Sequence, residues 1–285
     1  MKKTICGNTS RKHTIMMVLG ITALAVLMLV SIAGAAQSTN VWVHKGSELM
    51  SSGKYNEAIT AYDKAIEINP QNSDVWYKKG NILNKLGKYN GAMKAYEKAI
   101  EINPQNSNAW NNKGVTLAKL GDADEAVKAY EKAIETNQKN RGAWNNKGDV
   151  LGQLNQPDKA ITAYDKAIEI DPLDSEAWYN KAVTLNRLNK SDEAINAYDK
   201  VIEINPQNSD AWYNKGVVLD NLNKYDEAII AYDKASEINP PNSAVWYNKA
   251  VILSKLGDSD EAMKAYAKAI EINPLESEAW SMMKQ

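Results

Sequence analysis

The sequence predicts an all-α protein built as a stacked array of short helix pairs. All eight tryptophans fall on one series with a spacing of 34 residues: Trp42, Trp76, Trp110, Trp144, Trp178, Trp212, Trp246 and Trp280. A fixed period of this size indicates small structural units that bury their apolar faces against one another. Such an array offers a long surface for holding a partner, and it seldom supplies a catalytic centre.

Other residues recur with the same period. With tryptophan at position 4 of each repeat, the chain contains seven full repeats and a truncated eighth: 39–72, 73–106, 107–140, 141–174, 175–208, 209–242, 243–276 and 277–285. In every full repeat, position 8 is Gly or Ala, position 11 is Leu, position 20 is Ala and position 24 is Tyr. Position 27 is Ala except for Val201, and position 32 is Pro except for Gln138. These spacings predict two amphipathic helices per repeat.

The ends of both helices have recognisable signals. A serine at position 1 is expected to cap the first helix in most repeats (Ser73, Ser107, Ser175, Ser209, Ser243 and Ser277). Position 15 is always Gly or Asn, the residues that most easily adopt the left-handed conformation at a helix C-terminus. Acidic residues at positions 18 and 19 suit the start of the second helix, and the proline at position 32 ends it.

At these residues the chain resembles the tetratricopeptide repeat, whose pattern is a tryptophan, a small residue, an aromatic residue, two alanines and a proline in 34 residues. The resemblance covers residues 39–285. It implies a right-handed α-solenoid of antiparallel helix pairs over residues 37–285. It also implies that a protein or peptide partner binds the concave face.

The candidate binding face lies on the first helix of each repeat. On a helical wheel, positions 2, 5, 6, 9 and 13 lie opposite the apolar stripe, and in the family this side lines the concave groove. The residues predicted to bind a ligand are Tyr77, Tyr179, Tyr213, Tyr247, Asn112, Asn146, Asn180, Asn214, Asn248, Val183, Val217, Val251, Lys85, Lys119 and Arg187. Rings and amides suit an extended peptide. The same tyrosines also fit a structural role that stiffens the helix face, and the sequence leaves both open. If a hot spot exists, it is expected in the last three repeats.

A row of lysines predicts a ladder of charges. Position 7 is Lys in all seven full repeats, in the middle of the apolar stripe, where an unpaired ammonium is costly. Position 25 is acidic in repeats 1–6 but Ala267 in repeat 7, and position 7 of the next unit is Met283. Because both charges vanish at one junction, we expect pairs between neighbouring repeats: Lys79–Asp63, Lys113–Glu97, Lys147–Glu131, Lys181–Asp165, Lys215–Asp199 and Lys249–Asp233.

The N-terminal segment predicts export. Residues 1–36 contain basic residues followed by an uncharged run over 14–36 that ends in small residues, and they contain no acidic residue. This order is typical of a secretory signal peptide. The run is long for a signal and approaches the length of a membrane span, so a cleaved signal and a retained anchor through residues 14–36 both remain open. In either case the repeats are expected outside the cytoplasmic membrane, secreted or anchored.

Residues for catalysis are scarce. The chain has one cysteine, Cys6, and two histidines, His13 and His44, and no metal-ligand cluster, phosphate-binding loop or nucleophile elbow. We therefore predict neither an enzyme nor a cofactor. Without residues 1–36 the chain is mildly acidic, which argues against nucleic-acid binding. Asn189 begins the one glycosylation sequon of the repeats.

Together these observations predict a non-catalytic scaffold at the cell envelope that holds a protein or extended peptide in its groove. The first alternative is a structural module whose arrays self-associate. The second is the non-catalytic arm of an enzyme that is carried on another chain. The sequence does not name the partner.

Overall fold

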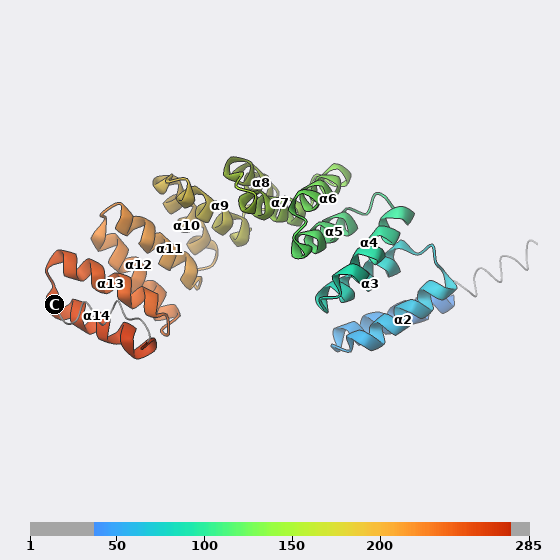
Figure 1. Cartoon of the computed structure of the whole chain (residues 1–285), viewed down its shortest axis with the longest axis horizontal. Helices are drawn as coiled ribbons and strands as arrows, with labels where there is room; N and C mark the ends of the chain where they lie inside the picture. Colours follow the sequence, from blue (N-terminus) through green and yellow to red (C-terminus); the bar gives the residue numbers. More distant parts are fainter. Residues whose placement is uncertain (1–36, 275–285) are drawn as a thin grey trace, which may run out of the picture. The chain divides into compact units, whose positions relative to one another are not determined.

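The computed structural model describes residues 37–274, in which all regular structure is helical. Consecutive helices are joined by turns of a few residues, and within each of the two compact units described below, neighbours along the chain run antiparallel (Figure 1). The segment predicted as signal or anchor, 1–36, and the truncated repeat at 277–285 lie outside the described residues. Across 37–274 no helix is both long and apolar enough to span a bilayer.

The chain divides into two compact units, 1–121 and 122–285, and the boundary falls within the third predicted repeat. The described part of the first unit begins with a helix over 37–51, followed by α2 (Tyr55–Ile68), α3 (Ser73–Lys85), α4 (Tyr89–Ile102) and α5 (Ser107–Leu120). The described part of the second unit contains α6 (Ala123–Thr136), α7 (Arg141–Gln153), α8 (Pro157–Ile170), α9 (Ser175–Arg187), α10 (Ser191–Ile204), α11 (Ser209–Asn221), α12 (Tyr225–Ile238), α13 (Ser243–Leu256) and α14 (Ser259–Ile272).

The turns between the paired helices have the predicted left-handed residue. Position 15 has a positive φ in every full repeat, from 55° at Asn155 to 90° at Gly121. Glycine adopts this conformation without steric cost, and asparagine tolerates it better than most residues do. This conformation turns the chain back after each first helix.

The predicted helix caps are wrong by one residue. The N-cap is the Asn or Asp at position 34 of the preceding repeat, and Asn72, for example, accepts a hydrogen bond from the Val75 amide at 3.3 Å. Serine is instead the first helical residue. Ser73 Oγ donates to the Ala99 carbonyl at 2.9 Å, and Ser209 Oγ donates to a corresponding carbonyl in α12. Both residue types can cap, so only the chain path decides which one does.

Within each unit, the core forms where a first helix crosses the second helix of its repeat. The position-24 tyrosines are buried, and alanines at positions 20, 23 and 27 let the helices approach closely. A Cβ placed on Gly80 would lie 2.6 Å from the Tyr96 ring, which explains the small residue at position 8. The sequence pattern missed positions 3 and 10, where Val75 and Ile82 are buried.

The tryptophans fix the turn between repeats. The Trp76 indole N–H donates to the Pro70 carbonyl at 3.0 Å, and Trp144 makes the same bond to Gln138, the one position 32 that lacks proline. Helix α6 accordingly ends at Thr136, the position at which the other second helices end. The indole hydrogen bond is therefore present with or without the proline.

Candidate functional site

In each unit, the first-helix face is the surface formed by positions 5, 6, 9 and 13 of its first helices, which are α3 and α5 in the first unit and α7, α9, α11 and α13 in the second. Its predicted tyrosines and asparagines are half-buried. Asn214 Nδ2 donates to the Tyr179 hydroxyl at 2.8 Å, and Asn248 Nδ2 donates to Tyr213 at 3.3 Å. Each bond joins the asparagine of one repeat to the tyrosine of the repeat before it. The face is therefore a ladder of Tyr–Asn rungs, a connection that the sequence did not reveal.

Each of these tyrosines also contacts the position-24 tyrosine of its own repeat. The ring centroids of Tyr77 and Tyr96 are 6.2 Å apart, and those of Tyr179 and Tyr198 are 6.0 Å apart with an edge-on geometry. The same contact recurs at Tyr213 and Tyr247. Contacts of this kind stabilise the array, so these four tyrosines have a structural role whether or not they bind a ligand.

Position 9 determines the surroundings of the buried tyrosine hydroxyl. Tyr96 donates to Asn81 at 2.9 Å, and Tyr164 donates to Asp149 at 2.8 Å. Burial raises the pKa of the Asp149 carboxyl, an effect that the Tyr164 hydrogen bond opposes. Burial and the Asp149 charge likewise raise the pKa of Tyr164. In the last three repeats, position 9 holds Val183, Val217 and Val251, which pack against the core instead.

Repeat 4 is one of the repeats without a tyrosine at position 5. Its position 5 is Asn145, which is buried and donates to Asp174 Oδ2 at 3.2 Å. Arg141, which stands in place of the usual serine, lies 2.6 Å from the same oxygen. The other oxygen of Asp174 caps α9 through the Glu176 and Ala177 amides. This network turns Asn145 away from the position that tyrosine occupies in other repeats.

A cavity of about 340 Å³ lies on the first-helix face between repeats 4 and 5. Its lining includes Asp149 and Tyr164 from repeat 4 and Asn180, Val183 and Arg187 from repeat 5. Three of the predicted binding residues therefore meet at one cavity. The volume is at the lower end of the range for small-molecule and side-chain pockets.

The remaining predicted cations are placed differently. The Lys85 ammonium lies 4.8 Å from the centre of the Tyr55 ring, so it contacts the preceding repeat. Lys119 is exposed at the end of α5. Arg187 is therefore the predicted cation that lines the cavity.

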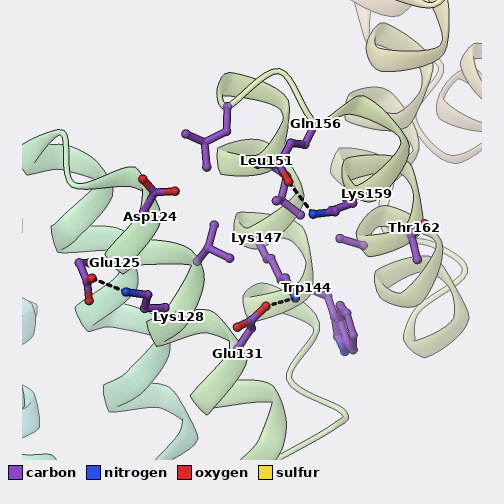
Figure 2. A pocket seen from close by; sticks show the side chains of 13 residues that line it. Asp124, Glu125, Lys128, Glu131, Trp144, Lys147, Leu151, Gln156, Lys159 and Thr162 are labelled. Carbon is purple, nitrogen blue, oxygen red and sulfur yellow. Dashed lines mark hydrogen bonds and ion pairs between the residues drawn. The ribbon is translucent and has the colours of Figure 1, made fainter.

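A second surface, which the sequence analysis missed, lies between successive second helices. In the second unit a hollow of about 690 Å³ is lined by α6, α7 and α8, with Trp144, Lys147 and Leu151 among its residues (Figure 2). Similar hollows lie beside Trp76 and Trp178, and we call these three hollows the outer hollows. The signal that could have revealed them is the combination of an invariant tryptophan and an invariant lysine one helical turn apart.

The predicted charge ladder is confirmed at all six junctions. The ammonium–carboxylate distances are 2.5 Å for Lys79–Asp63, 3.3 Å for Lys113–Glu97, 2.9 Å for Lys147–Glu131, 2.6 Å for Lys181–Asp165 and 2.5 Å for Lys215–Asp199, and Lys249 pairs with Asp233. Figure 2 shows the third of these pairs in the outer hollow.

These lysines have a second partner, which the sequence pattern does not reveal. Each ammonium also lies over the tryptophan ring of its own helix, 5.1 Å to 5.8 Å from the ring centre. Lys45 has only this partner, because within residues 37–274 no carboxylate pairs with it. A lysine in the apolar stripe is thus held between a ring and a carboxylate.

Among the described residues no group of three or more His, Cys, Asp or Glu side chains could hold a metal ion. His44 lies 3.5 Å from Glu48 one turn along the same exposed helix. The features that distinguish the described surface are therefore the first-helix face with its cavity and the outer hollows.

Sequence models described as TPR repeat match residues 46–83 and 80–121. Models described as tetratricopeptide repeat match 111–174, 145–209, 197–230 and 243–274. Comparison with curated proteins finds no match.

Several solved structures have a similar fold. YrrB, described as a TPR protein with an unusual peptide-binding site, is 23% identical with a TM-score of 0.60, over 68% of this chain and 100% of YrrB. MamA is 27% identical with a TM-score of 0.55, over 58% of this chain and 96% of MamA. PilF of Pseudomonas aeruginosa is 17% identical with a TM-score of 0.66, over 78% of this chain and 99% of PilF. The repeat-by-repeat matches, on the helix pairs described above, show that this chain belongs to the tetratricopeptide repeat family.

Proposed function

We propose that this protein is a scaffold that holds an extended segment of a partner protein along its first-helix face. TPR proteins bind proteins or peptides and are typically non-catalytic. YrrB, which has this fold, is described as having a peptide-binding site. The observation that carries the proposal is the cavity on the first-helix face, where Asn180, Val183 and Arg187 converge.

The chemistry of this face suits a polypeptide. Amide side chains both donate and accept hydrogen bonds, so they can match either group of a peptide backbone. The valines at position 9 add apolar area, and Arg187 and Glu176 add charges of opposite sign at the cavity. Repeats 5–7 have Tyr, Asn and Val at positions 5, 6 and 9, so their first helices would present the same groups to successive parts of an extended ligand.

We further propose that the repeats act outside the cytoplasmic membrane. The proposal rests on the basic and then apolar order of residues 1–36. Protease added to intact protoplasts should degrade the repeats. Full protection of the repeats would contradict export and leave peptide binding untouched.

Site-directed photo-cross-linking tests which surface binds. A photoreactive residue at position 183 lies on the first-helix face, and one at position 196 lies in the outer hollow of the same repeat. In the full-length protein in its own cells, position 183 should form adducts with another polypeptide and position 196 should not. Adducts that form mainly at 196 would overturn the assignment of the face.

A charge-swap pair provides the matched control. Exchanging the charges of Arg187 and Glu176 alters the cavity, whereas exchanging those of Lys200 and Glu203 alters an exposed pair on α10. Both double variants keep the net charge. Only the first should reduce the adduct at position 183. If the mapped adduct is a second copy of this chain, the self-associating structural module is the better description.

A further inference from the structure

The rung between repeats 4 and 5 lacks its tyrosine, and a cavity lies in its place. The junction of repeats 2 and 3 shows a complete rung: Asn112 Nδ2 donates to Asn81 Oδ1 at 2.8 Å and lies 3.4 Å from the Tyr77 hydroxyl. Beneath that ring, Tyr96 donates to the same Asn81 oxygen at 2.9 Å. These four side chains define the complete arrangement.

The junction of repeats 4 and 5 has the same framework without the ring. Asn180 Nδ2 donates to Asp149 Oδ1 at 2.8 Å, and Tyr164 donates to that oxygen at 2.8 Å. The residue at position 5 is Asn145, whose amide is turned toward Asp174 and is 5% exposed. The donor, the acceptor and the buried tyrosine are thus in place, and only the position-5 ring is missing.

The cavity of about 340 Å³ lies among these residues. In complete rungs the position-5 ring lies against the position-24 tyrosine and near the next repeat's position 6, and Tyr164 and Asn180 occupy those positions here. Gly152 also lines the cavity, and a Cβ placed on it would meet no atom within 4 Å. The Asn145 side chain is buried against Asp174 and does not fill the cavity. No side chain of the described residues therefore takes the place of the position-5 tyrosine ring.

We propose that this cavity accepts a tyrosine side chain of the bound partner segment, which completes the rung from outside. The inference rests on the proposed function of the first-helix face and names the residue that the face recognises at this point. The guest ring would pack edge-on against Tyr164, as Tyr179 packs against Tyr198.

The polar end of the cavity favours tyrosine over phenylalanine. In the complete rung of repeats 5 and 6, the Asn214 amide donates to the Tyr179 hydroxyl at 2.8 Å. Asn180 is the equivalent donor here, and its amide has two hydrogens, of which Asp149 receives one. A phenol hydroxyl can accept the other, whereas a phenyl ring would leave that donor without a partner.

The direct test uses 4-methylphenol, the side-chain analogue of tyrosine, as the probe. Titration of the full chain, followed by NMR of the Asn180 side-chain amide, should give a dissociation constant of about 1 mM. Toluene, which lacks the hydroxyl, should bind about tenfold more weakly, because it cannot accept the hydrogen bond from the half-buried Asn180 amide.

Asn145→Tyr supplies the missing ring from within and should abolish probe binding while raising the midpoint of thermal unfolding. Asn90→Tyr, at an exposed position of α4, should change neither property. Tyr77→Asn removes the ring from the complete rung and should create a second probe site in the first unit. Unchanged probe binding in Asn145→Tyr, or no binding in the wild type, would overturn the proposal.

Cross-linking at position 183 separates this proposal from the proposed function. If adducts persist but Asn145→Tyr and wild type bind the partner equally, the face binds a peptide and the tyrosine assignment is wrong. If Asn145→Tyr reduces the adduct and Asn90→Tyr does not, the result supports both the proposed function and the tyrosine assignment. Absence of adducts in a wild type that binds 4-methylphenol would refute the proposed function and leave the cavity's preference standing.

Discussion

The lysine held between a tryptophan ring and a carboxylate should be a measurable source of coupling between repeats. Lys181 is a suitable site, because its ammonium lies 2.6 Å from Asp165 and 5.3 Å from the centre of the Trp178 ring. Lys181→Met keeps an apolar stem of similar length and removes the charge. The variant should therefore lose both electrostatic contacts while retaining most of the packing.

The two contacts set the expected magnitude. The Lys181 side chain is 20% exposed and the Asp165 side chain is 44% exposed, so the ion pair should contribute about 0.5 kcal/mol, within the range for solvent-accessible pairs. The ammonium over the indole adds roughly 0.5–1 kcal/mol. Lys181→Met should thus lower the free energy of unfolding by about 1–1.5 kcal/mol.

A double-mutant cycle with Asp165→Asn isolates the ion pair. Chemical denaturation should give a coupling energy of about 0.5 kcal/mol that shrinks in 1 M salt, where the Debye length is about 3 Å. Lys45→Met is the matched control, because Lys45 has the Trp42 ring and, among residues 37–274, no carboxylate partner. Its effect should be smaller and should not depend on salt.

A Lys181–Asp165 coupling energy that is indistinguishable from zero at low salt, or that does not change with salt, would contradict this prediction. In that case each lysine extends past the ring to water, and the ladder contributes nothing to the stability of the array. Equal, salt-dependent losses for Lys45→Met and Lys181→Met would also contradict it, since only one of these lysines has an acidic partner.

Three further predictions concern single residues. Asn189→Ala should cost about 1 kcal/mol in denaturation experiments because the residue has a φ of 57°, whereas Asn189→Gly should not destabilise. Asp149→Asn should raise the free energy of unfolding at neutral pH, because burial raises the pKa of the Asp149 carboxyl above its ordinary value of 3.8 and folding therefore favours the protonated form. In denaturation experiments below pH 3.8, where the wild-type carboxyl is protonated, the variant should be no more stable than the wild type. Asp174→Ala should cost roughly 2–4 kcal/mol in urea denaturation, because it removes the cap of α9 and leaves the buried Asn145 amide without its acceptor. The ordinary cap removed by Asn208→Ala should cost about 1 kcal/mol, and equal losses would refute this prediction.

Strictly periodic features could be predicted from the sequence alone. The 34-residue period gave the helix pairs, the Gly or Asn at position 15 gave the turns, and the joint loss of charge at Ala267 and Met283 gave the ion-pair ladder. Each of these depends on local backbone preference or on a correlation that the repetition displays several times. Local preferences do not change when neighbouring repeats are added, so they can be read without coordinates.

The sequence could not decide which of two chemically similar residues plays a role, or which of two roles a residue plays. Serine and asparagine are adjacent and both cap helices, and the path of the chain assigned the cap to Asn72 and its equivalents. The position-5 tyrosines could serve a ligand or the fold, and the structure shows that Tyr179 and its equivalents contact the neighbouring repeat. Such choices depend on distances between residues about 35 positions apart.

The sequence by itself thus determined the family and the all-α fold of paired helices, because periodic apolar residues must be buried. Only the tertiary structure decided that Asn145 turns toward Asp174 and leaves a cavity over Tyr164. The physical reason is that asparagine stands at position 5 in repeat 3 as well as in repeat 4, so the repeat pattern does not show where the Asn145 amide lies. The side chains that surround Asn145 in space decide that.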